Sequence, residues 1–274
     1  MKIEVAQNQI QGDREYQQDS VGQRDVNGFK LLVLADGMGG YNGGEIASKI
    51  VVDTFMRHPF VNEKIFLEEA LAIANKKISE YKELHLDVSN MGTTVIALLM
   101  DESSYRWVSV GDSPLYLIKG NTIKRINDNH SVAGMLNSQV ERGEISVKKA
   151  EENKNRHMLT SAILGEEISM IDVSPLYTLS LNEKLILASD GIETLSENEI
   201  LTIVNSSANN LLASQTVLAE IEKRQKRNQD NATLIIATPL ISKIDKRNVQ
   251  KSNDSYIRLF LLLVSMIVLF LLWK

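Results

Sequence analysis

The 274-residue sequence predicts an α+β protein in which two antiparallel β-sheets pack face to face and helices cover their outer faces. Strand-like runs follow one another with short links, and the helical patterns occur in separate blocks. Because parallel strands need long crossover connections, short links favour antiparallel pairing. The order is strands, two helices, strands, a helix-prone insert, strands, helices and a final strand. An apolar stretch near the C-terminus adds one predicted transmembrane helix.

Periodicity places the individual elements. The predicted strands cover residues 2–6, 29–35, 92–100, 105–110, 115–118, 122–126, 168–173, 184–189 and 232–237. The predicted helices cover residues 45–58, 63–84 and 211–223, with a shorter helix that begins at the capping box Ser196–Glu199. Residues 130–160 are polar and predict small helices or a flap over one edge of the sandwich.

Composition excludes several classes of protein. The chain is 43% hydrophobic and 24% charged, which is typical of a globular protein. It has no cysteine, so it has neither a disulfide framework nor a thiol nucleophile. The net charge of −5, without a basic stripe, gives no footprint for a nucleic-acid partner.

The stretch from residue 31 to residue 44 combines an apolar run, a carboxylate and several glycines. An apolar run from Leu31 ends in the carboxylate of Asp36, and glycines follow as far as Gly44. Such a run bounded by turn residues is typical of a buried strand. The glycines let the backbone turn sharply and approach a ligand closely. The alternative is an ordinary strand and tight turn, in which aspartate is a common residue.

Four aspartates share this relation to a strand. Asp36, Asp112 and Asp190 each follow an apolar run, and Asp230 precedes one. In antiparallel pairing, the residue after one strand lies at the same end as the residue before its neighbour. We therefore expect Asp36, Asp190 and Asp230 to converge. Clustered carboxylates repel one another, and a hard divalent cation removes that repulsion. Oxygen ligands alone favour magnesium, manganese or calcium over zinc.

The chain also resembles the metal-dependent PPM family of serine/threonine phosphatases, also called protein phosphatase 2C, in its bacterial form. The resemblance rests on R-E-Y-Q-Q-D at 14–19, D-G-M-G-G at 36–40, G-T-T at 92–94, V-G-D-S at 110–113, N-H-S at 129–131, S-D-G-I at 189–192 and D-N-A-T at 230–233. The seven motifs occur in the family's order and cover residues 1 to about 240. Met38 stands where some members have a histidine, so no general acid is assigned. Pro114 stands where arginine is usual.

The resemblance implies a four-layer α-β-β-α domain that hydrolyses phosphoserine or phosphothreonine with water held between two Mn²⁺ or Mg²⁺ ions. Asp36 would bridge the two ions, and the Gly37 carbonyl would bind one of them. Asp190 and Asp230 would complete the metal ligands.

The resemblance also implies roles for three further residues. Asp19 would act through metal-bound water, and Arg14 would bind the substrate phosphate through its planar guanidinium group. Arg14, Asp19 and Asp36 would be the catalytic residues. Asp112 matches a ligand of a possible third ion, whereas the position of the usual acidic partner falls near Thr194, next to Glu193.

The chain is predicted to divide into a phosphatase domain at 1–240, a polar linker at 241–255 and a transmembrane anchor at 256–274. The apolar run 257–273 would span about 26 Å as a helix, near the hydrocarbon thickness of about 30 Å. Basic residues precede it at Lys243, Lys246, Arg247 and Lys251, and Arg258 lies at its N-terminal end. By the positive-inside bias, the phosphatase domain would then lie in the cytoplasm. The alternative is a buried terminal helix of the globular domain.

These observations predict a membrane-anchored protein serine/threonine phosphatase, a phosphoric monoester hydrolase that opposes a serine/threonine kinase. Its partners would be phosphorylated proteins and the membrane. Two alternatives remain: a catalytically silent protein of the same fold that serves as a binding or regulatory module at the membrane, and another two-metal hydrolase such as a nuclease.

Overall fold

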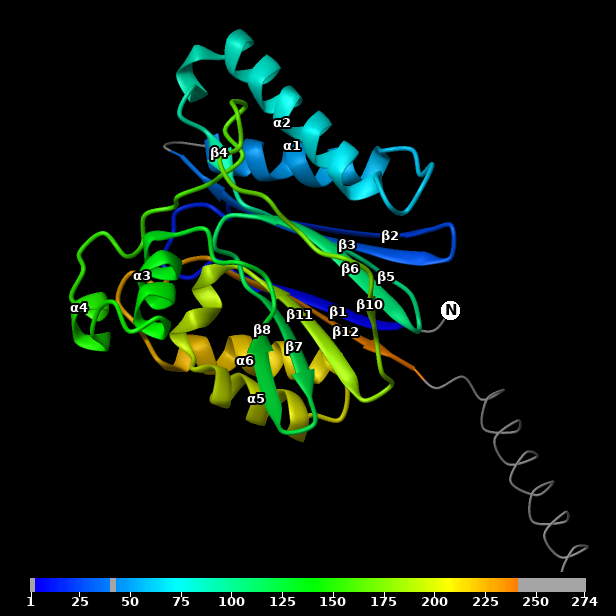
Figure 1. Cartoon of the computed structure of the whole chain (residues 1–274), viewed down its shortest axis with the longest axis vertical. Helices are drawn as coiled ribbons and strands as arrows, with labels where there is room; N and C mark the ends of the chain where they lie inside the picture. The colour runs from blue at the N-terminus through cyan, green and yellow to red at the C-terminus, as the bar shows by residue number, and fades with distance from the viewer. Residues whose placement is uncertain (1–2, 40–42, 241–274) are drawn as a thin grey trace, which may run out of the picture. The chain divides into compact units, whose positions relative to one another are not determined.

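The computed structural model describes residues 3–39 and 43–240 of the chain. Two sheets face each other, and helices cover the outer face of each (Figure 1). Every strand pair between the named strands is antiparallel. The predicted four-layer α+β sandwich is therefore confirmed.

The first sheet has the order β1-β12-β11-β7-β8, and the path of the second is β10-β6-β5-β3-β2, with β4 paired to β3 and β9 to β6. The strands of the first sheet are β1 (Ile3–Ile10), β7 (Leu115–Lys119), β8 (Thr122–Arg125), β11 (Glu183–Ala188) and β12 (Ala232–Pro239). Those of the second are β2 (Asp19–Val26), β3 (Phe29–Met38), β4 (Gly92–Thr93), β5 (Val95–Met100), β6 (Ser104–Val110), β9 (Asp172–Val173) and β10 (Tyr177–Thr178).

Helices lie in three places. Helices α1 (Gly43–Arg57) and α2 (Phe66–Leu84) cover the second sheet, and α5 (Glu197–Ser206) and α6 (Asn210–Lys223) cover the first (Figure 1). The capping box that begins α5 forms as predicted, with both Ser196 and Glu199 engaged. The polar insert carries α3 (Val132–Glu141) and α4 (Val147–Glu151). The short 3₁₀ segments are η1 (Leu86–Val88) and η2 (Asp190–Thr194).

The run 31–35 is apolar at every position because strand β3 is covered on both faces. Leu31 and Val33 pack toward α1 and α2, whereas Leu32 and Leu34 pack toward the other sheet. Successive side chains of a strand point to opposite faces, so a strand covered on both faces is apolar at every position. The burial of β3 on both sides fixes its register and with it the place of Asp36.

Several boundaries differ from those predicted. Strand β2 was not predicted, and β1 extends to Ile10. Of the predicted strand 168–173 only Asp172 and Val173 are in a strand, because the pairing with β6 is confined to those two residues. Strand β3 continues to Met38, so Asp36 lies within it rather than after it.

The predicted linker and transmembrane anchor, 241–255 and 256–274, lie outside the described residues. Between residues 3 and 240, with 40–42 left aside, no helix is both long and apolar enough to cross a membrane.

Candidate active site

The site begins with the pairing of β2 and β3, which places Asp19 directly opposite Asp36. Side chains of directly opposed residues in an antiparallel pair lie on the same face, with Cβ atoms about 5 Å apart. Asp19 is only 5% exposed, whereas Asp36 is partly open to solvent. Two carboxylates that belong to different sequence motifs are thus neighbours in the fold.

The backbone of Asp36 is held by the G-T-T motif. The hydroxyl of Thr93 and the backbone N–H of Thr94 donate to the Asp36 carbonyl at 2.8 and 2.9 Å. The Asp36 N–H donates in turn to Oγ1 of Thr94 at 3.1 Å. These three bonds fix the backbone of Asp36 and explain why threonines occur at this place.

The carboxylate of Asp19 joins the two sheets. Its Oδ2 accepts hydrogen bonds from the hydroxyls of Ser189 at 2.8 Å and Thr233 at 2.6 Å. Ser189 immediately precedes Asp190, and Thr233 belongs to the D-N-A-T motif. The other oxygen, Oδ1, is buried and has no hydrogen-bond partner among the described residues. A buried acceptor without a donor is costly, so Oδ1 is suited to a group that the protein does not itself supply.

Two glycines allow the motifs to meet. A Cβ atom on Gly191 would lie 2.0 Å from the carbonyl oxygen of Asn231, and one on Gly37 would lie 2.1 Å from that of Gly44. Neither approach is possible with a side chain. The D-G pairs therefore bring Asp190 against the beginning of β12, and Asp36 against the beginning of α1.

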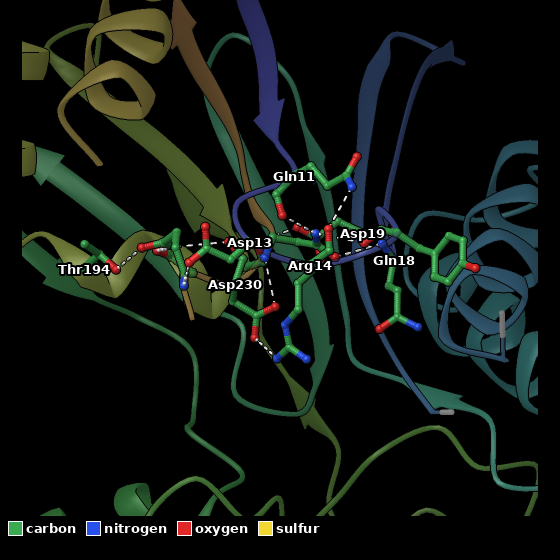
Figure 2. A network of polar contacts seen from close by, with 12 residues as sticks. Gln11, Asp13, Arg14, Gln18, Asp19, Thr194 and Asp230 are labelled. Atoms are coloured by element: carbon green, nitrogen blue, oxygen red, sulfur yellow. Dashed lines mark hydrogen bonds and ion pairs between the residues drawn. The ribbon is translucent and has the colours of Figure 1, made fainter. Parts of the chain in front are cut away.

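Asn231 fixes the loop that carries Arg14. Its Nδ2 donates to the carbonyls of Gln11 and Tyr16 at 2.7 and 3.1 Å, and its Oδ1 accepts from the N–H of Gln18 at 2.9 Å. Figure 2 labels Gln11 and Gln18, at the two ends of the loop between β1 and β2. The amide thus holds residues 11–18 beside the first residues of β12.

Arg14 projects from that loop onto Asp230. Its Nη2 donates to Oδ2 of Asp230 at 2.5 Å, and the two side chains face each other in Figure 2. This bond is the largest cause that raises the pKa of Arg14, and the charges of Asp190 and Asp36 raise it further. The Arg14 side chain is 55% exposed. It is therefore a cation at the solvent-facing rim of an acidic centre.

The pKa values of the aspartates are raised by burial and by one another's charges. Burial is the largest cause that raises the pKa of Asp36 well above its usual range. Further increases come from the charges of Asp19, Asp190, Asp112 and Asp230. Burial also raises the pKa of Asp190 to about 7 and that of Asp19 to about 6, the latter against the opposing effect of the Thr233 and Ser189 hydroxyls. The fold thus holds several carboxylates where their ionised forms are unfavourable.

As positioned, no three His, Asp or Glu side chains of residues 3–39 and 43–240 are close enough to hold a metal ion. The aspartates nevertheless raise one another's pKa values, because charges interact over longer distances than the 2.0–2.6 Å of metal–oxygen bonds. One oxygen of Asp230 is occupied by Arg14. The oxygen-only donors, the mutual repulsion and the unpaired Oδ1 of Asp19 all fit a hard divalent cation.

Asp112 follows β6, and its charge raises the pKa values of both Asp36 and Asp190. Its acidic neighbour is Glu193, whose pKa is raised by burial and by Asp112. Thr194 donates its hydroxyl to Oε1 of Gln229 instead.

Arg125, at the end of β8, was not among the predicted site residues. Its Nη2 donates to the carbonyls of Asp112 at 2.8 Å and Ser113 at 3.3 Å. It thereby anchors the loop beside Pro114, which has no side-chain donor. Only the pairing of Arg125 with Tyr116 across the β7–β8 hairpin brings it there, so no local motif indicates it.

A two-sheet sandwich with an acidic, oxygen-only centre at one rim is the architecture expected of a metal-dependent phosphatase. The chain belongs to the Protein phosphatase 2C family, whose model matches residues 9–234. It is an enzyme of the serine/threonine phosphatase class that uses Mn²⁺ or Mg²⁺, as predicted.

Similar proteins and structures come from bacteria. The serine/threonine phosphatase stp of Listeria welshimeri is 27% identical over 236 residues, which cover 82% of this chain and 88% of that one. The crystal structure of the Mycobacterium tuberculosis serine/threonine phosphatase PstP/Ppp has a TM-score of 0.74 at 26% identity, and covers 86% of this chain and 98% of that one. A structure of the PstP catalytic domain in complex with two manganese ions has a TM-score of 0.71 at 26% identity, with 86% and 97% covered.

Proposed function

We propose that this enzyme hydrolyses phosphoserine and phosphothreonine in proteins and so reverses the action of a serine/threonine kinase. The observation that carries the proposal is the acidic centre itself, in which Asp36 lies within the electrostatic reach of four other aspartates and Arg14 lies at the rim. Membership of the Protein phosphatase 2C family and similarity to named serine/threonine phosphatases support it.

Four residues would hold two Mn²⁺ or Mg²⁺ ions: Asp36, Gly37 through its carbonyl, Asp190 and Asp230. When bound, the pair of ions would lower the pKa of water at the centre and neutralise phosphoryl charge. Asp19 would accept a hydrogen bond from water through Oδ1, the oxygen that has no partner in the fold. Asp112, with Glu193 as its neighbour, would contribute to a third ion.

Arg14 would bind the substrate phosphate. Its guanidinium is exposed and stands over the carboxylates, and a planar fork of N–H donors matches phosphate oxygens. The bond to Asp230 would then be exchanged for bonds to phosphate, and the carboxylate of Asp230 would be available as a metal ligand. Arg14 would thus orient the phosphate at the mouth of the site.

The test is hydrolysis of a phosphothreonine peptide by the full chain with Mn²⁺, with and without EDTA. We expect turnover that EDTA abolishes and added Mn²⁺ restores, and Asp36→Asn should remove it. Activity that survives EDTA or this substitution would contradict the proposal. Binding of Mn²⁺ without any turnover would instead indicate a catalytically silent member of the fold.

We also propose that residues 256–274 anchor the enzyme in a membrane, with the phosphatase domain in the cytoplasm. The apolar run 257–273 and the basic residues before it support this orientation. An anchor raises the local concentration of the enzyme near membrane-bound phosphoproteins and kinases. Deletion of 256–274 should release the protein from the membrane fraction with its turnover unchanged. Recovery of the full chain entirely in the soluble fraction would refute the anchor.

A further inference from the structure

A cavity of about 440 Å³ lies between α3 and the segment that precedes it. The lining residues that matter are Arg125, Asp128, His130, Met135, Glu141 and Met170. The motif N-H-S at 129–131 forms part of its wall, and neither the metal ligands nor Arg14 do. The cavity is therefore a feature of the polar insert that the proposed chemistry leaves unexplained.

Arg125 joins this cavity to the acidic centre. Its Nη2 donates to the carbonyl of Asp112 at 2.8 Å and to that of Asp128, on the cavity wall, at 3.3 Å. The charge of Asp112 in turn reaches Asp36 and Asp190. Through Arg125, one wall of the cavity is thus bonded to the loop of Asp112, an aspartate whose charge reaches the acidic centre.

The charges of the cavity favour a cation. The carboxylates of Asp128 and Glu141 are exposed, and neither forms an ion pair within the described part of the chain. Arg125 is the one cationic residue of the lining, and its Nε and Nη2 donate to carbonyl oxygens and to Asn127 of its own wall. Two carboxylates without an ion pair thus line the cavity, and the guanidinium of Arg125 is already bonded to other groups of the protein.

His130 supplies an independent indication of a ligand. It is 4% exposed and lines the cavity, and its Nδ1 accepts from the N–H of Gly111 at 3.2 Å. A neutral imidazole with Nδ1 as acceptor carries its proton on Nε2. Nε2 forms no hydrogen bond with the described residues. His130 is thus a largely buried lining residue that keeps, at Nε2, a donor which no described residue uses and which is suited to a carbonyl group.

We propose that this cavity binds the side chain of a lysine or arginine that lies within a few residues of the phosphorylated residue of the substrate. The proposal rests on the proposed function and names the class of phosphoprotein. The half-exposed thioethers of Met135 and Met170 would contact the aliphatic stem. Asp128 and Glu141 would pair with the charged end, and His130 would donate from Nε2 to a backbone carbonyl of the peptide.

The test compares phosphothreonine nonapeptides in which one lysine is moved along an otherwise uncharged sequence. For the full chain with Mn²⁺, we expect kcat/KM at the best lysine position to exceed that of the matched glutamine peptide about fivefold, the scale of about 1 kcal/mol for a solvent-accessible ion pair. The preference should shrink as salt is added.

The double variant Asp128→Asn, Glu141→Gln should lose this preference while its turnover of p-nitrophenyl phosphate stays unchanged. Glu151→Gln, an exposed acid of α4 outside the cavity lining, is the control and should keep the preference. Equal rates for lysine and glutamine peptides at every position, or a preference that survives in the double variant, would overturn the proposal. A wild-type chain without any metal-dependent turnover would overturn the proposed function and this inference together.

Discussion

Asp19 of β2 lies directly opposite Asp36 of β3 in the antiparallel register, and its Oδ1 is buried without a hydrogen-bond partner among the described residues. Backbone pairing thus forces two carboxylates onto one face, where Asp190, Asp112 and Asp230 add further negative charge. Such an arrangement costs stability in the absence of a cation. The register of one strand pair is therefore the structural basis of the acidic centre.

Asp19→Asn should lower Mn²⁺ affinity or turnover about 10- to 100-fold, the usual effect of losing a group that supports metal ligands. The amide keeps the size of the side chain but replaces one oxygen by a donor and removes the charge. Calorimetric titration and kcat/KM measure the two effects. Asp25→Asn, on the same strand but paired with Lys30 at the surface, is the matched control. Equal losses in both variants would contradict a special role for Asp19.

Gly191→Ala should destabilise the domain by several kcal/mol, because the new Cβ would lie 2.0 Å from the carbonyl oxygen of Asn231. The midpoint of thermal unfolding reports the loss. Gly120→Ala is the control: its Cβ meets open space, and its φ of +58° costs only about 1 kcal/mol. Similar midpoints for the two variants would show that the backbone at Gly191 can move aside.

Arg14→Lys should raise KM for a phosphothreonine peptide about tenfold or more, because a charge-assisted bidentate contact contributes about 1.5–3 kcal/mol. Lysine keeps the charge but loses the planar fork. Binding of Mn²⁺ in the absence of substrate should persist. Arg142→Lys, in an exposed pair with Glu144, is the control and should leave KM unchanged. An unchanged KM for Arg14→Lys would assign phosphate binding to another group.

Metal-free protein should become less stable as the pH rises through the range in which the buried aspartates ionise. Their folded pKa values of about 7 for Asp190 and about 6 for Asp19 exceed the usual 3.8. Between these limits the folded state binds more protons than the unfolded state, so the free energy of unfolding falls with rising pH. His130 acts in the opposite direction, because burial lowers its pKa below 6.5.

Mn²⁺ should therefore raise the melting temperature more at about pH 7.5 than at about pH 5.5, where protons compete for the same carboxylates. Thermal unfolding with and without Mn²⁺ measures this difference, and Asp190→Asn should flatten the pH dependence of the metal-free protein. The same slope in wild type and Asp190→Asn would show that this carboxylate is not the group that titrates.

Arg125→Ala should cost about 1–3 kcal/mol of unfolding free energy, because the carbonyls of Asp112 and Ser113 lose a shared donor in a half-buried place. Chemical denaturation measures the loss. Arg125→Lys should restore only part of it, since a single ammonium group cannot repeat the contacts of Nε and Nη2 with separate acceptors. Full stability in the alanine variant would mean that the loop is held by Asn127 alone.

Much of the fold could be predicted because the long buried strands are apolar on both faces, as β3 shows with Leu31 and Leu32 packed on opposite sides. Strand β2 could not, because beyond Asp19 its residues are half-exposed or exposed, and its sequence, D-S-V-G-Q-R-D-V, alternates weakly. β2 is a strand because its backbone pairs with β3, not because its sequence has a strong strand pattern.

The predicted strand ends indicated which aspartates lie near one another, but not which hydrogen bonds hold them in place. Ser189 and Thr233 bond to Asp19 across 170 and 214 positions of sequence, and no local pattern carries such a separation. Arg125 reaches the Asp112 loop only through the β7–β8 hairpin. Motifs therefore indicated the acidic groups, whereas the supporting bonds required the three-dimensional register.

Calorimetric titration of Mn²⁺ into the full chain and into Asp36→Asn tests the central claim most directly. The account predicts that the wild-type protein binds two Mn²⁺ ions and that Asp36→Asn, with its fold intact by circular dichroism, binds neither with comparable affinity. Equal Mn²⁺ binding by the two proteins would show that the carboxylates around Asp36 do not form the metal centre.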